Sequence, residues 1–254
     1  MSVRELANLT WQDVGSTDRE RAVAILPIGA VEAHGPHLPI GTDVLIAEAM
    51  AHTGADKLST RGLDVLLLPV LAYAAAPFAA DFPGTLSPEP EALTRQIVGV
   101  AESLARHDFE VFALANAHLD PTHLGAIHAA VTEVRHAGRI RVVFPDVTQK
   151  PWATRLTAEF KSGACHAGRY ETSLVMAIRP DLVREEVRRH LPPNARSLST
   201  AIAAGQKSFV EAGGPRAYFG YPAEATPDEG RSSLIALGAI LEEAVMIEFA
   251  RGTA

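Results

Sequence analysis

Two short segments of the sequence carry the residue types of a metal site. Glu32 and His34 lie two residues apart in one segment, and His118 and Asp120 lie two residues apart in the other. Side chains two positions apart in an extended chain point the same way, so each segment presents a carboxylate and an imidazole together. Asp43, at the expected start of a helix, can be directed back toward the same place. These three carboxylates and two imidazoles form one set of candidate ligands.

This donor set favours a pair of divalent metal ions. Nitrogen and oxygen ligands suit zinc, manganese or iron, and five of them exceed the needs of a closed tetrahedral zinc site. Two ions that share one carboxylate leave positions open for water and substrate. Such a centre lowers the pKa of a bound water and polarises a carbonyl group, which the hydrolysis of an unactivated amide requires.

Two further residues fit roles around such a centre, although spacing alone leaves plainer alternatives. His166 is the candidate donor of a proton to the leaving nitrogen, because histidine titrates near neutral pH. Glu171 can complete the ligand shell or orient a ligating histidine. In the plainer interpretation Asp43 is a helix cap, and His37 and His123 only form hydrogen bonds within their loops.

The elements that must position these residues follow an α/β pattern. Apolar runs of strand length alternate with stretches of helical period, which is typical of a parallel sheet covered by helices. The expected strands are 21–31, 63–73, 109–118 and 139–147. The expected helices are 44–58, with the Asp43 carboxylate as its cap, then 91–107, 122–138, 166–178 and 227–252, with a polar excursion over 188–200. Parallel sheets bind ligands beyond the carboxyl ends of their strands, which is where the candidate ligands fall.

Composition limits the other classes of function. The 254 residues have 47% hydrophobic and 21% charged side chains, which predicts one globular domain over 1–254. The net charge of −7 argues against binding to nucleic acid or to anionic membranes. We expect a cytoplasmic protein, because the sequence has neither an apolar run long enough to span a membrane nor a signal peptide. Cys165 is the single cysteine, which excludes a thiolate-rich metal site and an internal disulfide.

A longer stretch of sequence resembles a known family. The string PIGAVEAHGPHLPIGTD, at 27–43, resembles the signature of the creatininase (creatinine amidohydrolase) family. Four further segments resemble family landmarks in the family's order: FPGT at 82–85, NAH at 116–118, HAGRYETS at 166–173 and GYPAEATPDEG at 220–230. The resemblance extends over essentially the whole chain.

The resemblance implies a three-layer α/β/α fold with a mostly parallel sheet, a homohexamer, and two zinc or manganese ions per chain. It makes Glu32, Asp43 and His118 ligands of one ion. The other ion then takes His34, the bridging Asp43 and the acid two residues after His118, which is glutamate in creatininase and Asp120 here. His166 matches the histidine assigned to proton transfer, and Glu171 matches the glutamate of the HAGxxET motif. Whether Asp120 or Glu171 completes the second metal site stays open.

Departures from the family pattern bear on the substrate. Leu119 stands where creatininase has a bulkier residue, and the loop around Ala76 lacks the serine and histidine of many relatives, so we expect a more apolar pocket wall. Trp152 is the candidate for an aromatic lid over the substrate. We therefore expect hydrolysis of a cyclic or other non-peptide C–N bond in a small molecule other than creatinine. A deformylase and a peptidase of cofactor maturation are alternatives within the enzyme class, and a metal-binding pseudoenzyme or small-molecule binding module is the alternative outside it.

Overall fold

The computed structural model describes residues 2–164 and 166–252, so Cys165 lies outside the described residues. Its centre is a five-stranded sheet of β1 (Val3–Glu5), β2 (Ala22–Ile28), β3 (Asp64–Leu67), β4 (Val111–Asn116) and β5 (Arg141–Val143). The strand order is β1-β3-β2-β4-β5, and every neighbouring pair is parallel. The sheet confirms the predicted α/β class.

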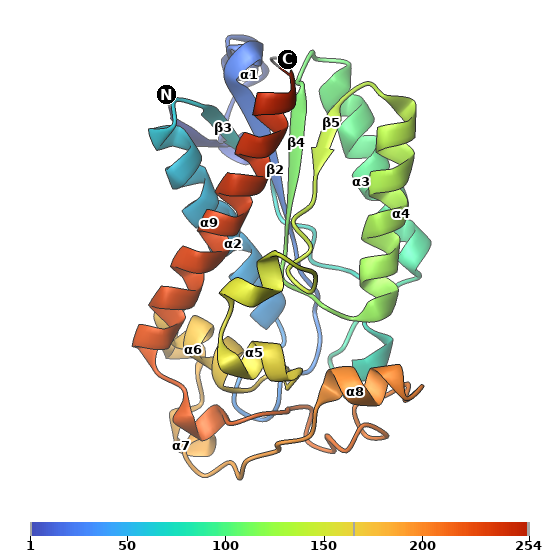
Figure 1. Ribbon diagram of the computed structural model, residues 1–254, viewed down its shortest axis with the longest axis vertical. Helices are drawn as coiled ribbons and strands as arrows, with labels where there is room; N and C mark the ends of the chain where they lie inside the picture. The colour runs from blue at the N-terminus through green and yellow to red at the C-terminus, as the bar shows by residue number, and fades with distance from the viewer. Residues whose placement is uncertain (1, 165, 253–254) are drawn as a thin grey trace.

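Helices cover both faces of this sheet (Figure 1). The helices α2 (Thr42–Thr60), α6 (Arg169–Ile178) and α9 (Pro227–Gly252) lie on one side, and α3 (Pro90–Ala105) and α4 (Pro121–Ala137) lie on the other. The contacts of α9 with α2 and α6 hold the first layer together. The structure therefore has the three-layer α/β/α arrangement that the sequence predicts.

The central strand β2 explains how one sheet builds two cores. Val23 and Ile25 pack into the core beneath α2 and α9, whereas Ala24, Leu26 and Ile28 pack into the core beneath α3 and α4. Successive side chains of a strand point to opposite faces, so a strand between two helical layers must be apolar at every position. This is why its sequence is a continuous apolar run with no alternation.

Short elements gather at the carboxyl ends of the strands. In Figure 1 the helices α5 (Ala158–Ser162), α7 (Glu185–Arg188) and α8 (Leu198–Ala203) lie at the lower end of the molecule, opposite both chain termini. The helix α1 (Trp11–Gly15) lies at the upper end. Short 3-10 helices occur at Leu6–Asn8, Arg19–Arg21, Pro77–Ala79, Trp152–Arg155, Pro180–Leu182 and Pro222–Glu224. No helix within the described ranges is both long and apolar enough to cross a bilayer.

Several predicted boundaries are wrong. The strand expected over 63–73 ends at Leu67, and beyond it only an isolated bridge joins Leu71 to Ile28, because Pro69 has no amide to donate to a ladder. The strand expected over 139–147 spans only Arg141–Val143. The edge strand β1 was not predicted, since three residues carry too little periodicity to be recognised.

Two helix starts differ from prediction in ways that matter for the site. Gly41, not Asp43, is the N-cap of α2, and no side chain caps that end. The Asp43 carboxylate is therefore free to point toward the strand ends. The helix α6 begins at Arg169 rather than at 166, so His166 lies in the loop before it.

Candidate metal centre

Six buried side chains converge beyond the carboxyl ends of β2 and β4. Three are carboxylates and three are imidazoles, and every one is at most 6% exposed. They form three overlapping groups whose ligand atoms lie within 4.8 Å of one another: Glu32, His34 and His166; Glu32, Asp43 and His118; and His34, Asp43 and Glu171. The structure therefore brings together four of the five predicted ligands and both residues predicted to assist them.

Asp43 lies at the centre of these groups. Its Oδ1 is 3.1 Å from Nε2 of His34, and its Oδ2 is 3.0 Å from Nδ1 of His118. Oε1 of Glu32 is 3.2 Å from the same Nδ1 of His118. Since each oxygen of one carboxylate faces a different histidine, Asp43 has the geometry of a ligand shared between two positions.

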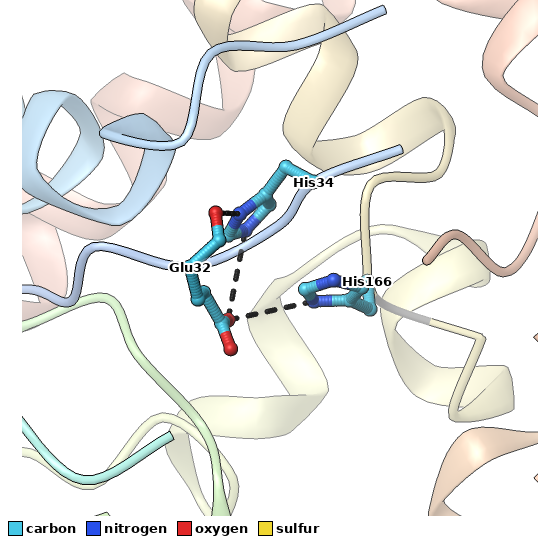
Figure 2. Close-up of side chains that lie close together, drawn as sticks. All are labelled: Glu32, His34 and His166. Carbon is cyan, nitrogen blue, oxygen red and sulfur yellow. Dashed lines mark hydrogen bonds and ion pairs between the residues drawn. The ribbon is translucent and has the colours of Figure 1, made fainter. Parts of the chain in front are cut away.

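Main-chain carbonyls fix the orientation of all three imidazoles. A carbonyl oxygen only accepts hydrogen bonds, so the ring nitrogen facing it is the donor and the other nitrogen turns toward the carboxylates. Figure 2 shows one ring nitrogen of His34 and one of His166 facing the Glu32 carboxylate, and the other nitrogen of His34 facing the Glu32 carbonyl. The three hydrogen bonds are His34 Nδ1 to the Glu32 carbonyl (3.2 Å), His118 Nε2 to that of Ala75 (2.9 Å) and His166 Nε2 to that of Ala33 (2.9 Å).

The carboxylates make the cluster strongly attractive to positive charge. Burial lowers the pKa of His34, but Asp43, Glu171 and Glu32 outweigh it and raise that pKa to about 10. Burial is likewise outweighed at His118, whose pKa is held well above its ordinary value by Glu32 and Asp43. Burial raises the pKa of Glu171 to about 8. Three carboxylates this close together in a buried site require cations as partners.

The residues present fit divalent metal ions. Three buried atoms of the cluster have no hydrogen-bond partner in the described part of the chain: Glu32 Oε2, His34 Nε2 and Asp43 Oδ2. Within residues 2–164 and 166–252, no lysine or arginine pairs with these carboxylates, whose ion-pair partners are histidines. Imidazole nitrogens and carboxylate oxygens are the donors that zinc and manganese accept.

Asp120 and Glu171 have different surroundings. Oδ1 of Asp120 accepts a hydrogen bond from the amide of Thr122 at 2.7 Å, so this side chain caps α4 and belongs to none of the three groups. Glu171 Oε2 lies 3.5 Å from Nε2 of His34 and accepts from the amide of Ala167 at 2.6 Å. The geometry thus favours Glu171 as the third member of the group with His34 and Asp43.

His166 is positioned at the edge of the cluster. Its Nδ1 is 3.7 Å from Oε1 of Glu32, and its ring packs between those of His34 and Phe209. Burial and the charge of His34 lower the pKa of His166 well below its ordinary value, so its Nδ1 carries a lone pair. This nitrogen can accept a proton or act as a ligand.

The remaining two histidines near the site have structural partners. His37 Nε2 lies 2.9 Å from Oγ1 of Thr172, which ties the motif loop to α6. His123 Nε2 lies 2.7 Å from Oδ1 of Asn116, whose amide group donates to the carbonyl of His118. The hydrogen bond of His37 therefore helps to position the loop that carries Glu32 and His34, and that of His123 helps to position the segment that carries His118.

A cavity of about 420 Å³ opens onto the cluster. Glu32, Asp43, His118, His166 and Glu171 contribute to its wall, together with Asp120. Its apolar lining is Phe78, Leu119, Phe160, Leu198, Ile202 and Phe209. An apolar pocket with a few convergent polar groups is the usual form of a small-molecule site.

The predicted substrate-contacting residues have different positions in relation to this cavity. Leu119 lines it, as expected for a substrate contact. Trp152 does not line it and packs against the core, whereas its neighbours Ala153 and Thr154 do line it. Ala76 is fully buried and is not part of the lining.

Glu159 is a buried acid that sequence analysis missed. Its carboxylate accepts hydrogen bonds from the amides of Tyr170 and Tyr221, at 2.6 and 2.8 Å. A side chain at Gly168 would collide with it, so the loop carrying His166 and the segment near 220 both close around this one carboxylate. In the sequence Glu159 lies in a short polar helix and has no feature that distinguishes it from a solvated residue.

Replacing Glu159 with alanine is expected to destabilise the protein by about 3 kcal/mol, because the amides of Tyr170 and Tyr221 lose a charged acceptor. The free energy of unfolding from urea denaturation measures this change. Glu186→Ala is the matched control, because the Glu186 side chain is 84% exposed. Equal stability of the two variants would show that Glu159 does not hold these loops.

Fold and cluster together define the class: an α/β/α protein with a buried histidine and carboxylate centre at the strand ends. The chain belongs to the creatininase family, since the family model described as creatinine amidohydrolase matches residues 7–245. This family is hydrolytic.

Relatives of known name extend this comparison. A mycofactocin precursor peptide peptidase of Mycobacterium tuberculosis is 31% identical over 240 residues, which cover 92% of this chain and 88% of the relative. A creatinine amidohydrolase of Pseudomonas putida is 31% identical over 197 residues, covering 70% and 73% of the two chains. A solved structure named "Creatininase Mn" is 25% identical, with a TM-score of 0.74 and coverage of 98% and 99%. The chain is thus equally identical, at 31%, to a relative named as a peptidase and to one named as a creatinine amidohydrolase.

Proposed function

We propose that this protein is a metal-dependent amidohydrolase that cleaves a C–N bond in a small molecule. The observation that carries the proposal is the set of three carbonyl-anchored imidazoles whose free nitrogens face three carboxylates on the wall of an apolar cavity. Two zinc or manganese ions would fit this set, with Asp43 between them. The related structure named as a manganese creatininase supports that choice of metal.

Bound metal would supply an activated water and polarise the amide carbonyl. The chain's own residues set the geometry of that reaction. Asp43 contacts both groups of ligands, one through each of its oxygens. The hydrogen bond to the Ala75 carbonyl fixes the orientation of the His118 ring. Phe78 and Leu119 exclude bulk water from the wall beside the cluster.

His166 carries the proton in this proposal. With Nε2 donating to the Ala33 carbonyl, Nδ1 is the free nitrogen and faces the cluster at 3.7 Å from Glu32. It can take a proton released during attack and deliver it to the leaving nitrogen. The ring of Phe209, with its centroid 4.1 Å from that of His166, shields this transfer from solvent.

A peptidase is the second candidate, because a relative with that name matches 92% of the chain. A deformylase is a third activity for the same chemistry. To distinguish them, protein stripped with a chelator and reloaded with zinc or manganese would be assayed against cyclic ureas, lactams, formamides and short peptides. We expect metal-dependent hydrolysis of one class. Full metal loading with no hydrolysis of any class would favour the alternative of a pseudoenzyme or binding module.

Replacing Glu171 with glutamine is expected to lower the affinity for the second metal ion by about 10- to 100-fold, because a neutral amide replaces an anionic donor. Asp120→Asn is the matched variant, since asparagine still caps α4. We expect Asp120→Asn to keep both ions. Metal titration followed by elemental analysis would decide, and loss of the second ion only in Asp120→Asn would assign that ligand to Asp120.

We also propose a homo-oligomer, a hexamer by family resemblance, in the cytoplasm. Large exposed apolar side chains on the outer surface support association: Ile235 and Ile247 on α9 are 59% and 43% exposed. No nucleic acid or membrane partner is proposed, in keeping with the net charge of −7.

A further inference from the structure

Two lysines bring positive charge to the opening of the cavity. Lys150 and Lys161 both line it, and both are exposed residues. The sequence has just two other lysines, Lys57 and Lys207, and neither belongs to the described lining. Half of the lysines in a chain with a net charge of −7 are thus gathered at the opening of the candidate active site.

The ammonium groups of these two lysines are available to bind a ligand. In the described part of the chain neither Lys150 nor Lys161 forms an ion pair, whereas several arginines are paired with acids. Nearby hydroxyl groups are already engaged, because Thr148 donates to Asp146 and Thr154 donates to a main-chain carbonyl. The lysines are therefore the free cationic donors that a molecule entering the cavity would meet.

The cavity lining combines buried acids, exposed cations and apolar side chains. The carboxylates of Glu32, Asp43 and Glu171 belong to its buried part, and the two lysines belong to its exposed part. Phe78, Leu198 and other apolar side chains make up most of the remaining wall. A substrate that matches this pattern has a reactive amide, an apolar portion and an anionic group at the far end.

We propose that Lys150 and Lys161 bind a carboxylate on the substrate, so that the substrate class is an amide bearing a free carboxylate beyond an apolar group. This inference rests on the proposed function. It adds that the substrate carries a negative charge and that the two lysines bind that charge. The lysines orient the molecule, because a carboxylate held at the opening directs the amide toward the buried cluster. N-acyl derivatives of ω-amino acids, and lactams whose nitrogen carries an alkyl chain ending in a carboxylate, share this chemistry.

Matched probes test the proposal by binding. N-acetyl-6-aminohexanoate is compared with N-acetyl-6-aminohexanol, and the lactam 1-(5-carboxypentyl)pyrrolidin-2-one with 1-(6-hydroxyhexyl)pyrrolidin-2-one, by calorimetry on the protein as purified with its metal. Each pair differs only in having a carboxylate or a neutral alcohol. We expect at least one acid to bind about 3- to 30-fold more tightly than its alcohol, the range that two exposed ion pairs provide. The preference is expected to shrink at high salt.

Charge-neutral variants identify the groups responsible. In Lys150→Gln/Lys161→Gln the preference for the acid is expected to fall to about 1-fold, since its cationic partners are gone. Lys57→Gln/Lys207→Gln makes the same change in net charge away from the cavity and should keep the preference. A preference that survives in the first double variant would mean that the metal centre binds the carboxylate, and would overturn the proposal. Equal or undetectable binding of acid and alcohol by the wild type would also overturn it.

Hydrolysis of the same probes separates this inference from the proposed function. Cleavage of the lactam acid or of the acyclic acid tells which source of the carboxylate is used. If neutral amides are hydrolysed as fast as acidic ones, the proposed function stands and the role of the lysines is wrong. If the acids bind through the lysines but no amide is hydrolysed under any metal load, the lysine site stands and the proposed function fails.

Discussion

The Asp43→Ala variant is expected to lose both metal ions and all measurable hydrolysis. Asp43 is the one carboxylate whose two oxygens face different histidines, at 3.1 Å from His34 and 3.0 Å from His118. It is also the only member shared by the group with Glu32 and His118 and the group with His34 and Glu171, among the described residues. Removing it therefore takes a donor from both positions at once, whereas removing any other carboxylate of the cluster leaves one position with its full set.

Elemental analysis of purified wild type and variant measures this effect. Asp43 does not cap α2, so the variant is expected to keep its fold, which the far-UV circular dichroism spectrum and the unfolding transition would check. Asp43→Asn provides a matched variant of the same size that retains one weak oxygen donor. A folded Asp43→Ala protein with its full metal content and normal turnover would remove Asp43 from the centre.

Replacing His166 with alanine is expected to slow turnover by about two to four orders of magnitude while the metal content stays unchanged. This expectation follows from the position of the His166 ring. The free Nδ1 of His166 faces Glu32 from the edge of the cluster, and the ring is held by the Ala33 carbonyl and by Phe209. A group in this place can move a proton without being needed to hold the ions.

Steady-state kinetics with parallel metal analysis would measure the His166 effect. His136→Ala is the control, because His136 is an exposed residue in the last turn of α4 and lies outside the cavity lining. Turnover equal to that of wild type would exclude proton transfer by His166. Loss of metal together with turnover would instead make His166 a ligand, consistent with its group with Glu32 and His34.

Much of the fold follows from local sequence patterns. The continuous apolar run of β2 predicts a strand buried on both faces, and the helical periods of α3, α4 and α9 predict the layers that cover it. The predicted ends of helices and strands are wrong where tertiary contacts override a local sequence preference. Asp43 is predicted to be a helix cap because Asp is common there, but the tertiary structure directs its side chain to His34 and His118. The N-cap is Gly41, and α2 begins at Thr42 without a side-chain cap.

The clustering of the candidate site residues could be predicted where they lie close in sequence, and less so where their approach depends on tertiary contacts. Glu32 and His34 share one extended segment, and their same-facing arrangement follows from its period of two. Glu171 comes from α6, far along the chain, so its approach to His34 depends on how that helix packs. Glu159 has no sequence signal at all, because its function in the fold is to accept hydrogen bonds from amides that only folding brings near it.

The central claim is a dinuclear metal centre bridged by Asp43. Anomalous diffraction from crystals of the manganese- or zinc-loaded protein, collected on both sides of the metal absorption edge, tests it most directly. The account predicts two anomalous peaks per chain at the strand ends, one beside Glu32 and His118 and one beside His34, with an oxygen of Asp43 at each. A single peak, or peaks away from these side chains, would contradict it.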